Sequence, residues 1–143
     1  MNIYFACSVT GGRDQTGANE KIVDRLLSRG HIVPTEHLAR SDALAFADDI
    51  DPEVVYKRDI DWIDECDALI AEVSTPSHGV GYEIAYALGQ EKPVFCCSRR
   101  GLSLSMMITG NDSPRLVVRT YENVDEVLEL IDMFLSDLQD EMK

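Results

Sequence analysis

The sequence is short of basic residues and of long apolar runs, and each shortage excludes a class of protein. Its 13 lysines and arginines stand against 26 aspartates and glutamates, a formal net charge of −13, so a nucleic-acid backbone would be repelled. No apolar run approaches the roughly 18 residues that a membrane-spanning helix needs. The N-terminal stretch MNIYFACSVTGG has no basic segment before its apolar run, which argues against a cleavable signal. We therefore expect a cytoplasmic protein with no nucleic-acid or membrane partner.

Cysteine and histidine are also scarce, and their spacing fits no metal site. The chain has three histidines and four cysteines, and no two cysteines form a C-x-x-C pair. Cys96 and Cys97 are neighbours, which disfavours a disulfide between them. We therefore expect buried free thiols in a reducing compartment, no metal ion and no organic cofactor.

The sequence does contain a regular alternation of apolar runs and amphipathic segments. Five apolar runs predict buried strands, at 2–8, 31–35, 67–73, 93–98 and 115–121. Three amphipathic segments predict the longest helices, at 16–30, 51–66 and 123–142. Apolar strands that alternate with helices predict an α/β fold: one Rossmann-like or flavodoxin-like doubly wound domain over residues 1–143, with about five parallel strands. Pro34 places the second strand at an edge or ends it.

Ligands of such sheets bind at the carboxyl ends of the strands, near the switch in strand order. This rule indicates three loops, at 8–13, 74–81 and 98–105. In the first loop, Gly11 and Gly12 permit close approach of the backbone, and Ser8 and Thr10 offer hydroxyl groups. Taken alone, this loop is either an ordinary tight turn or a phosphate or sugar contact.

The loop after the third strand reads STPSHGVGYE and contains more polar groups. Gly79 and Gly81 have G-x-G spacing, but Ile84 stands where a third glycine would complete a dinucleotide-binding motif. Ser77 can donate a hydrogen bond. Glu83 is expected in the first turn of the next helix, where an acid can simply complement the helix dipole and face water.

A second acid lies on the helix expected at 51–66. One face of that helix is apolar, with Val55, Trp62, Ile63 and Cys66. Asp59 lies in the middle of this face, where an ionised carboxylate needs a partner or a purpose. It is either a structural aspartate bonded to a backbone N–H or an arginine, or a carboxylate that lines a cleft. Because this helix leads into the strand that precedes Glu83, the two carboxylates can meet, as in enzymes that cleave glycosidic bonds.

On these residues the sequence resembles the 2′-deoxynucleoside 5′-monophosphate N-hydrolases, relatives of the nucleoside 2-deoxyribosyltransferases. The matching segments are IYFACSVTGGR (3–13), TEH (35–37), RDIDWIDECDALIAEVSTPSHGVGYEIAYAL (58–88) and LSMMITG (104–110). They cover most of the chain, and the block that ends in G-V-G-Y-E is the most specific. The resemblance implies hydrolysis of the N-glycosidic bond to free base and 2-deoxyribose 5-phosphate.

The resemblance also implies roles for particular residues. Glu83 would attack C1′ and form a covalent intermediate with the sugar. Asp59 would protonate the departing base, and Tyr4 would hold the nucleophile in place. The substrate-binding residues would be Ser8, Thr10, Gly11, Gly12, Ser77, Gly79, Gly81 and Ser105.

In this resemblance Ser105 reaches the phosphate of a second subunit, so the chain is expected to form a homodimer. The neighbouring apolar run, Leu104 to Ile108, would then belong to the dimer contact; otherwise it is a helix that packs on the core. One departure concerns Thr10, where family members often carry an arginine. Arg13, Arg99 or Arg100 are the candidates to supply the missing positive charge.

Three other functions compete with this interpretation. A nucleoside 2-deoxyribosyltransferase would pass the sugar to another base, but the serine-lined loops favour a monophosphate substrate. A ribonucleotide N-glycosidase is disfavoured by Tyr4, because some ribo-specific relatives carry phenylalanine there. A non-catalytic nucleotide-binding module remains open, since the fold alone does not decide function.

Overall fold

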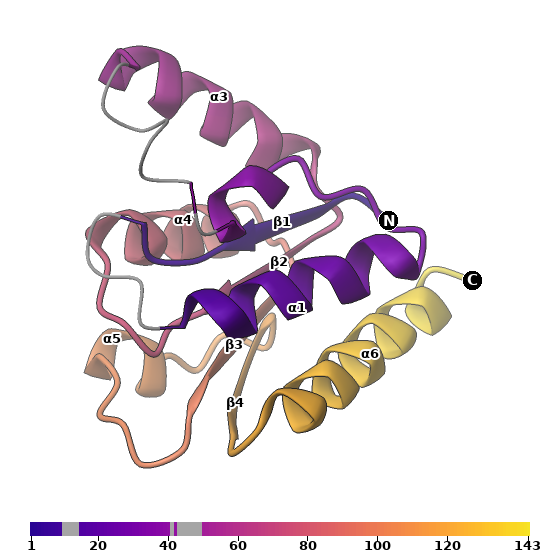
Figure 1. The fold of residues 1–143 in the computed structure, drawn as a ribbon. Helices are drawn as coiled ribbons and strands as arrows, with labels where there is room; N and C mark the ends of the chain where they lie inside the picture. The colour runs from indigo at the N-terminus through magenta and orange to yellow at the C-terminus, as the bar shows by residue number, and fades with distance from the viewer. Residues whose placement is uncertain (10–14, 41, 43–49) are drawn as a thin grey trace.

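Four parallel strands and the helices around them form the structure, a computed structural model that describes residues 1–9, 15–40, 42 and 50–143. The strands are β1 (Ile3–Ala6), β2 (Ala68–Glu72), β3 (Val94–Arg99) and β4 (Leu116–Tyr121), and they lie in the order β1-β2-β3-β4 (Figure 1). The helices are α1 (Thr16–Ser28), a 3-10 helix η1 (Glu36–Ala39), α3 (Pro52–Glu65), α4 (His78–Gly89), α5 (Met106–Thr109) and α6 (Val124–Glu141). The predicted α/β class with a parallel sheet is therefore confirmed.

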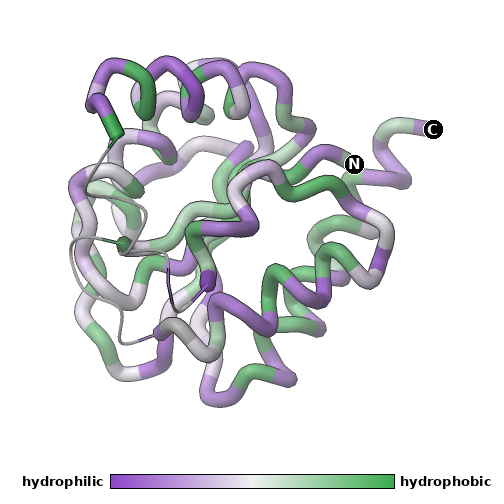
Figure 2. The backbone as a smooth tube through the Cα atoms, turned by 45° about the horizontal axis from the view of Figure 1, so that its top comes forward, coloured by the Kyte–Doolittle hydropathy of each residue, from purple (hydrophilic) through white to green (hydrophobic). Residues whose placement is uncertain are grey.

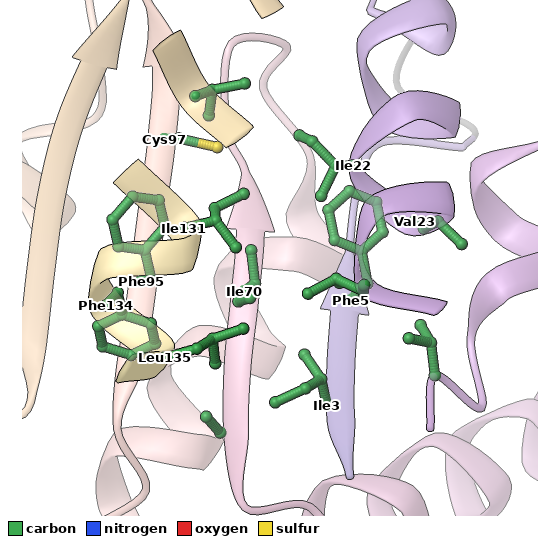
Figure 3. Close-up of a cluster of buried hydrophobic side chains, with 14 of the residues drawn as sticks. Ile3, Phe5, Ile22, Val23, Ile70, Phe95, Cys97, Ile131, Phe134 and Leu135 are labelled. Atoms are coloured by element: carbon green, nitrogen blue, oxygen red, sulfur yellow. The ribbon is translucent and has the colours of Figure 1, made fainter. Parts of the chain in front are cut away.

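Helices cover both faces of the sheet, α1 and α6 on one face and α3 and α4 on the other (Figure 1). Side chains alternate along each strand, so Phe5 packs toward α1 and α6, whereas Tyr4 packs toward α3 and α4. Figure 3 shows the first of these clusters, in which Phe5 and Ile70 meet Ile22. Figure 2 shows hydrophobic strands in the interior and mixed colours along the outer helices.

The segment expected as the second strand, 31–35, does not form a regular strand. It makes one bridge, between Asn2 and Ile32, at the outer edge of β1. Beyond the bridge, Pro34 has no N–H to donate. The hydroxyl of Thr35 instead accepts from the backbone N–H of Phe5 (3.0 Å) and donates to its carbonyl (2.7 Å). The hydroxyl of Thr35 thus takes the place of the next pair of backbone hydrogen bonds between the two segments. The described sheet therefore has four strands rather than about five.

This edge segment still decides the topology. With it beside β1, the chain first moves outward from β1 and then crosses back to β2, so the strand order switches between β1 and β2. That is the flavodoxin-like order, in which the crevice at the carboxyl ends of these two strands is the usual ligand site.

Helix α4 starts earlier than expected, and this changes the place of Glu83. Ser77 is the N-cap, and its hydroxyl accepts from the backbone N–H of Val80 (3.3 Å). Gly79 and Gly81 therefore belong to the first turn of the helix, and Glu83 lies in the second turn, not the first. The helix tolerates both glycines because its apolar residues pack on the sheet at helical spacing, which outweighs propensity.

Two further expectations concern the cysteines and the membrane. All four cysteines are buried free thiols, as predicted. Among the described residues, no helix is long and apolar enough to cross a membrane.

Candidate active site

A buried tyrosine and a glutamate meet at the centre of the α3/α4 side of the sheet. Tyr4 lies on β1 with no exposed surface, and its hydroxyl donates to Glu83 Oε1 at 2.9 Å. Glu83 lies on the sheet-facing side of α4, one residue before the buried Ile84 and half-buried itself. The structure therefore brings together two residues 79 positions apart in sequence, as the resemblance implied.

The two groups titrate far apart. The pKa of Glu83 is raised from 4.5 to about 7, mainly by burial; the hydrogen bond from Tyr4 opposes the rise, and the charge of Asp59 adds to it. Burial also raises the pKa of Tyr4 far above its ordinary range, helped by the charges of Glu83 and Asp59. Tyr4 thus remains a hydrogen-bond donor, and Glu83 is the group that changes charge near neutral pH.

Asp59 lies on α3 with 15% of its side chain exposed. Arg58 donates from Nε to Asp59 Oδ1 at 2.9 Å, and its Nη2 lies 2.9 Å from the same oxygen in an ion pair. The guanidinium of Arg58 lies over the ring of Trp62, with its central carbon 4.8 Å from the ring centroid. His37 meets the same ring edge-on, with centroids 6.0 Å apart. The sequence left open whether Asp59 has an arginine partner or lines a cleft, and the structure shows both.

Asp59 and Glu83 line one cavity of about 330 Å³ at the switch in strand order. Its described lining also includes Ala6, Cys7, Val9, His37, Leu38, Ile50, Val55, Arg58, Ser77, Gly79 and Val80. Sites for small molecules typically measure about 300–1,000 Å³. The cavity is therefore large enough for a small ligand, and it carries two carboxylates on facing helices.

The start of α4 gives one side of this cavity a positive character. Ser77 and Gly79 line the cavity, and the first N–H groups of a helix have no partner within the helix. Together with the helix dipole, such groups attract an anion. One side of the cavity thus suits an anionic group, while the carboxylates suit a centre that develops positive charge.

The other predicted substrate-binding residues lie elsewhere or outside the described residues. Ser8 is buried at the end of β1, and its hydroxyl has no hydrogen-bond partner among the described residues. Gly81 and Ser105 line a separate groove of about 690 Å³ between α4 and α5, where Ser105 caps α5. Thr10, Gly11, Gly12 and Arg13 lie outside the described residues.

The two described candidates for the missing positive charge are both engaged. Arg99 extends its guanidinium over the ring of Tyr121, 5.5 Å from the centroid, and its Nε donates to Gln15. Arg100 pairs with Glu122 and Glu126 on the surface. Neither arginine lines the cavity that holds Glu83.

Sequence reasoning missed two residues near the carboxyl edge of the sheet. Arg58 could have been found, because an arginine four residues before Trp62 on one helix can stack on its ring. Glu72, 2% exposed at the end of β2, accepts from the backbone N–H and hydroxyl of Ser74 and from the hydroxyl of Tyr121. Nothing in the sequence distinguished it from the apolar strand around it.

Comparison with known proteins identifies the family. Residues 3–125 match the family model described as nucleoside 2-deoxyribosyltransferase. The chain belongs to the nucleoside 2-deoxyribosyltransferase family. The resemblance of the sequence to this group of proteins is thereby confirmed.

Relatives within this family extend over nearly the whole chain. A protein of Thermofilum pendens with the provisional name 2′-deoxynucleoside 5′-phosphate N-hydrolase 1 is 39% identical, covering 94% of this chain and 95% of its own. The 5-hydroxymethyl-dUMP N-hydrolase of Esox lucius is 38% identical, covering 90% of this chain and 94% of its own. The human protein of the same name is 36% identical, and the match covers 92% of this chain and 78% of the human protein.

Solved structures share the fold. A CMP N-glycosidase of Clostridium botulinum superposes with a TM-score of 0.69 at 21% identity, covering 92% of this chain and 99% of its own. A 2-deoxyribosyltransferase of Bacillus psychrosaccharolyticus superposes with a TM-score of 0.64 at 24% identity, covering 90% of each chain. At these identities the likeness concerns the fold alone.

Proposed function

We propose that this protein is an N-glycosidase that hydrolyses 2′-deoxynucleoside 5′-monophosphates to free base and 2-deoxyribose 5-phosphate, with residues 1–143 forming one catalytic domain. The observation that carries the proposal is the hydrogen bond from Tyr4 to Glu83 in a cavity that Asp59 also lines. The names of the relatives that cover most of the chain support the same reaction. Four buried free thiols fit a cytoplasmic setting.

The reaction proceeds in two steps. Glu83 attacks C1′ as the bond to the base breaks; the electron pair of that bond leaves with the base, which takes up a proton through Asp59. Water then attacks C1′ and gives a proton back to Asp59, which releases the sugar phosphate and restores the carboxylate of Glu83. Tyr4 supports both steps, because its hydroxyl holds Glu83 Oε1 and leaves the other carboxylate oxygen to react.

The phosphate would bind at the start of α4. Ser77 and Gly79 place unpaired backbone N–H groups at the cavity there, and Ser8 brings a buried hydroxyl with no partner among the described residues. Thr10, Gly11 and Gly12 would complete this cradle. Fixing the phosphate positions C1′ at Glu83, which is the main benefit of binding a group remote from the reaction.

The enzyme would act as a homodimer in which Ser105 reaches the partner's phosphate. In one chain Ser105 caps α5 on the groove between α4 and α5, away from the cavity with Glu83. Met106 and Met107 beside it are 87% and 84% exposed. Two adjacent exposed methionines fit a surface that a second copy covers.

The test is chromatography of the products from a panel of ribo- and deoxynucleoside monophosphates, with and without an acceptor base. We expect free base and 2-deoxyribose 5-phosphate from deoxynucleotides with wild type, and none with Glu83→Gln. Transfer to the acceptor at the expense of water would instead make the enzyme a transferase. Nucleotide binding without any base release would overturn the proposal, and a monomer by light scattering would overturn the dimer.

A further inference from the structure

Arg58 is the one side chain with a permanent positive charge among the described residues that line the cavity. Of its side chain, 27% is exposed. His37, which also lines the cavity, has its pKa lowered from 6.5, first by partial burial and then by the charge of Arg58, so it is neutral at neutral pH. Among the described lining residues, a single guanidinium thus pairs with Asp59 and shares the cavity with Glu83.

The guanidinium has donors left over. Arg58 Nε donates to Asp59 Oδ1 and Nη2 forms the ion pair with the same oxygen, whereas Nη1 makes no hydrogen bond among the described residues. The ring of Trp62 packs against the guanidinium of Arg58 and limits its orientation. A partly buried donor that is held by an ion pair and a ring contact, with spare N–H groups at a cavity wall, is suited to bind an oxygen of the ligand.

The wall beside Arg58 is suited to a flat base. Leu38 of η1, Ile50 just before α3 and Val55 of α3 line the cavity, whereas Ser77 and Gly79 lie at the start of α4. With the phosphate at α4 and the sugar at Glu83, the base extends toward α3 and η1. This placement rests on the proposed function.

We propose that Arg58 is a catalytic residue that donates a hydrogen bond to the carbonyl oxygen beside the glycosidic nitrogen of a pyrimidine base. As the bond from C1′ to N1 breaks, its electron pair moves onto the ring and concentrates on that oxygen. Arg58 stabilises this charge until the proton arrives through Asp59, while the carboxylate of Glu83 forms its bond to C1′. Charge-assisted donors aimed at a developing anion contribute strongly to catalysis.

A preference for pyrimidines follows from the same geometry. A pyrimidine has a carbonyl next to the nitrogen that bonds to the sugar, whereas a purine has a ring carbon without oxygen at that place. Arg58 therefore has an acceptor of growing charge only in pyrimidine substrates. We expect wild type to release pyrimidine bases from deoxynucleoside monophosphates more efficiently than purine bases.

The test measures kcat/KM across 5-substituted deoxyuridine monophosphates whose bases differ in acidity. We expect Arg58→Met to lose about 100-fold on deoxyuridine monophosphate but far less on the most acidic base, which leaves without help. Arg58→Lys should recover part of the loss. Lys57→Met, at an exposed neighbouring cation, is the matched control and should follow wild type.

A second comparison separates contact with the base from an effect through Asp59. In an Asp59→Asn background, Arg58→Met should still reduce kcat/KM and still steepen its dependence on base acidity. An equal loss on every substrate, or no further loss in that background, would overturn the inference while leaving the hydrolase intact. Absence of base release by wild type on all substrates would overturn the hydrolase and the inference together.

Discussion

The two faces of the sheet each hold a buried tyrosine that donates to a glutamate. On the α3/α4 face Tyr4 donates to Glu83 at 2.9 Å, and on the α1/α6 face Tyr121 donates to Glu72 at 3.2 Å. Both tyrosines are fully buried, and burial raises the pKa of both carboxyl groups. The Tyr4–Glu83 and Tyr121–Glu72 pairs are therefore alike in their hydrogen bond and in their burial.

The two glutamates differ in whether they reach a cavity and in how many hydrogen-bond donors they already bind. Glu83 lines the cavity and has one donor, Tyr4. Glu72 lines none of the cavities at the carboxyl edge of the described sheet, and one of its oxygens accepts from Ser74 twice and from Tyr121. A raised pKa beside a tyrosine thus marks any buried carboxyl group. A carboxyl group that can react must also reach a ligand and keep an oxygen free.

Alanine at each glutamate should separate catalysis from stability most strongly. Glu83→Ala removes the proposed nucleophile and should lower kcat by at least about 1,000-fold. At pH 5, where folded Glu83 is protonated, it should change the free energy of unfolding by less than about 1 kcal/mol, because the site opens to a cavity. Glu72→Ala leaves the Ser74 and Tyr121 donors unpaired in the interior and should cost about 2–4 kcal/mol. Steady-state kinetics and urea unfolding measure the two effects.

Glu72→Gln is the control for this comparison, since its amide oxygen can still accept from Ser74 and Tyr121. It should keep both kcat and stability near wild type. If Glu72→Gln loses as much kcat as Glu83→Ala while it remains folded, the division between a reactive and a structural glutamate is wrong.

The fold could be predicted because its signals are local. Apolar runs gave all four strands, and Asp51 and Asn123 mark the starts of α3 and α6 with the side-chain caps that the structure shows. The segment 31–35 was wrong as a strand because Thr35 bonds to Phe5 through its hydroxyl, a contact between distant residues. No local pattern records such a contact.

The site could be predicted in part, because some of its residues also leave a local signal in the sequence. Asp59 stood out as an acid on an apolar helix face. Glu83 also fitted an ordinary acid in a first helical turn until it was considered beside Asp59, and Tyr4 came only through the family resemblance. The start of α4 was misplaced because Gly79 and Gly81 read as a loop, although packing on the sheet keeps them helical. Glu72 was invisible, since its donors come from β4 and from the loop beyond its own strand.

The acid limb of the pH dependence of activity should belong to Glu83. Its pKa is raised to about 7, and the nucleophile must be ionised, so kcat/KM should rise about tenfold per pH unit below that value and level off above it. Glu72→Gln should leave this acid limb in place. If the acid limb disappears in Glu72→Gln, the group that titrates is Glu72 on the α1/α6 face, and the assignment to Glu83 is wrong.

The titration of Glu83 should also affect stability, but in the opposite direction: the free energy of unfolding should fall as pH rises, whereas activity increases. Glu83 keeps its proton in the folded state up to about pH 7 but loses it near 4.5 when unfolded, so unfolding becomes easier as pH rises between these values. Above pH 7 the loss should be about 3 kcal/mol, since the pKa rises by about 2.5 and each pKa unit counts about 1.4 kcal/mol. Glu83→Gln should lack this slope, and urea unfolding at pH 5 and pH 8 measures it.

The smallest effects should come from the tyrosines, and they test the comparison most finely. The hydrogen bond from Tyr4 lowers the pKa of Glu83, so Tyr4→Phe should move the acid limb upward by up to about one pH unit and lower kcat several-fold. Tyr121→Phe should leave the limb unmoved and cost about 1 kcal/mol of stability, because Glu72 loses one of three donors. Equal shifts of the limb in both variants would mean that the two faces are coupled, and the tyrosine at Glu83 would then have no special part in tuning it.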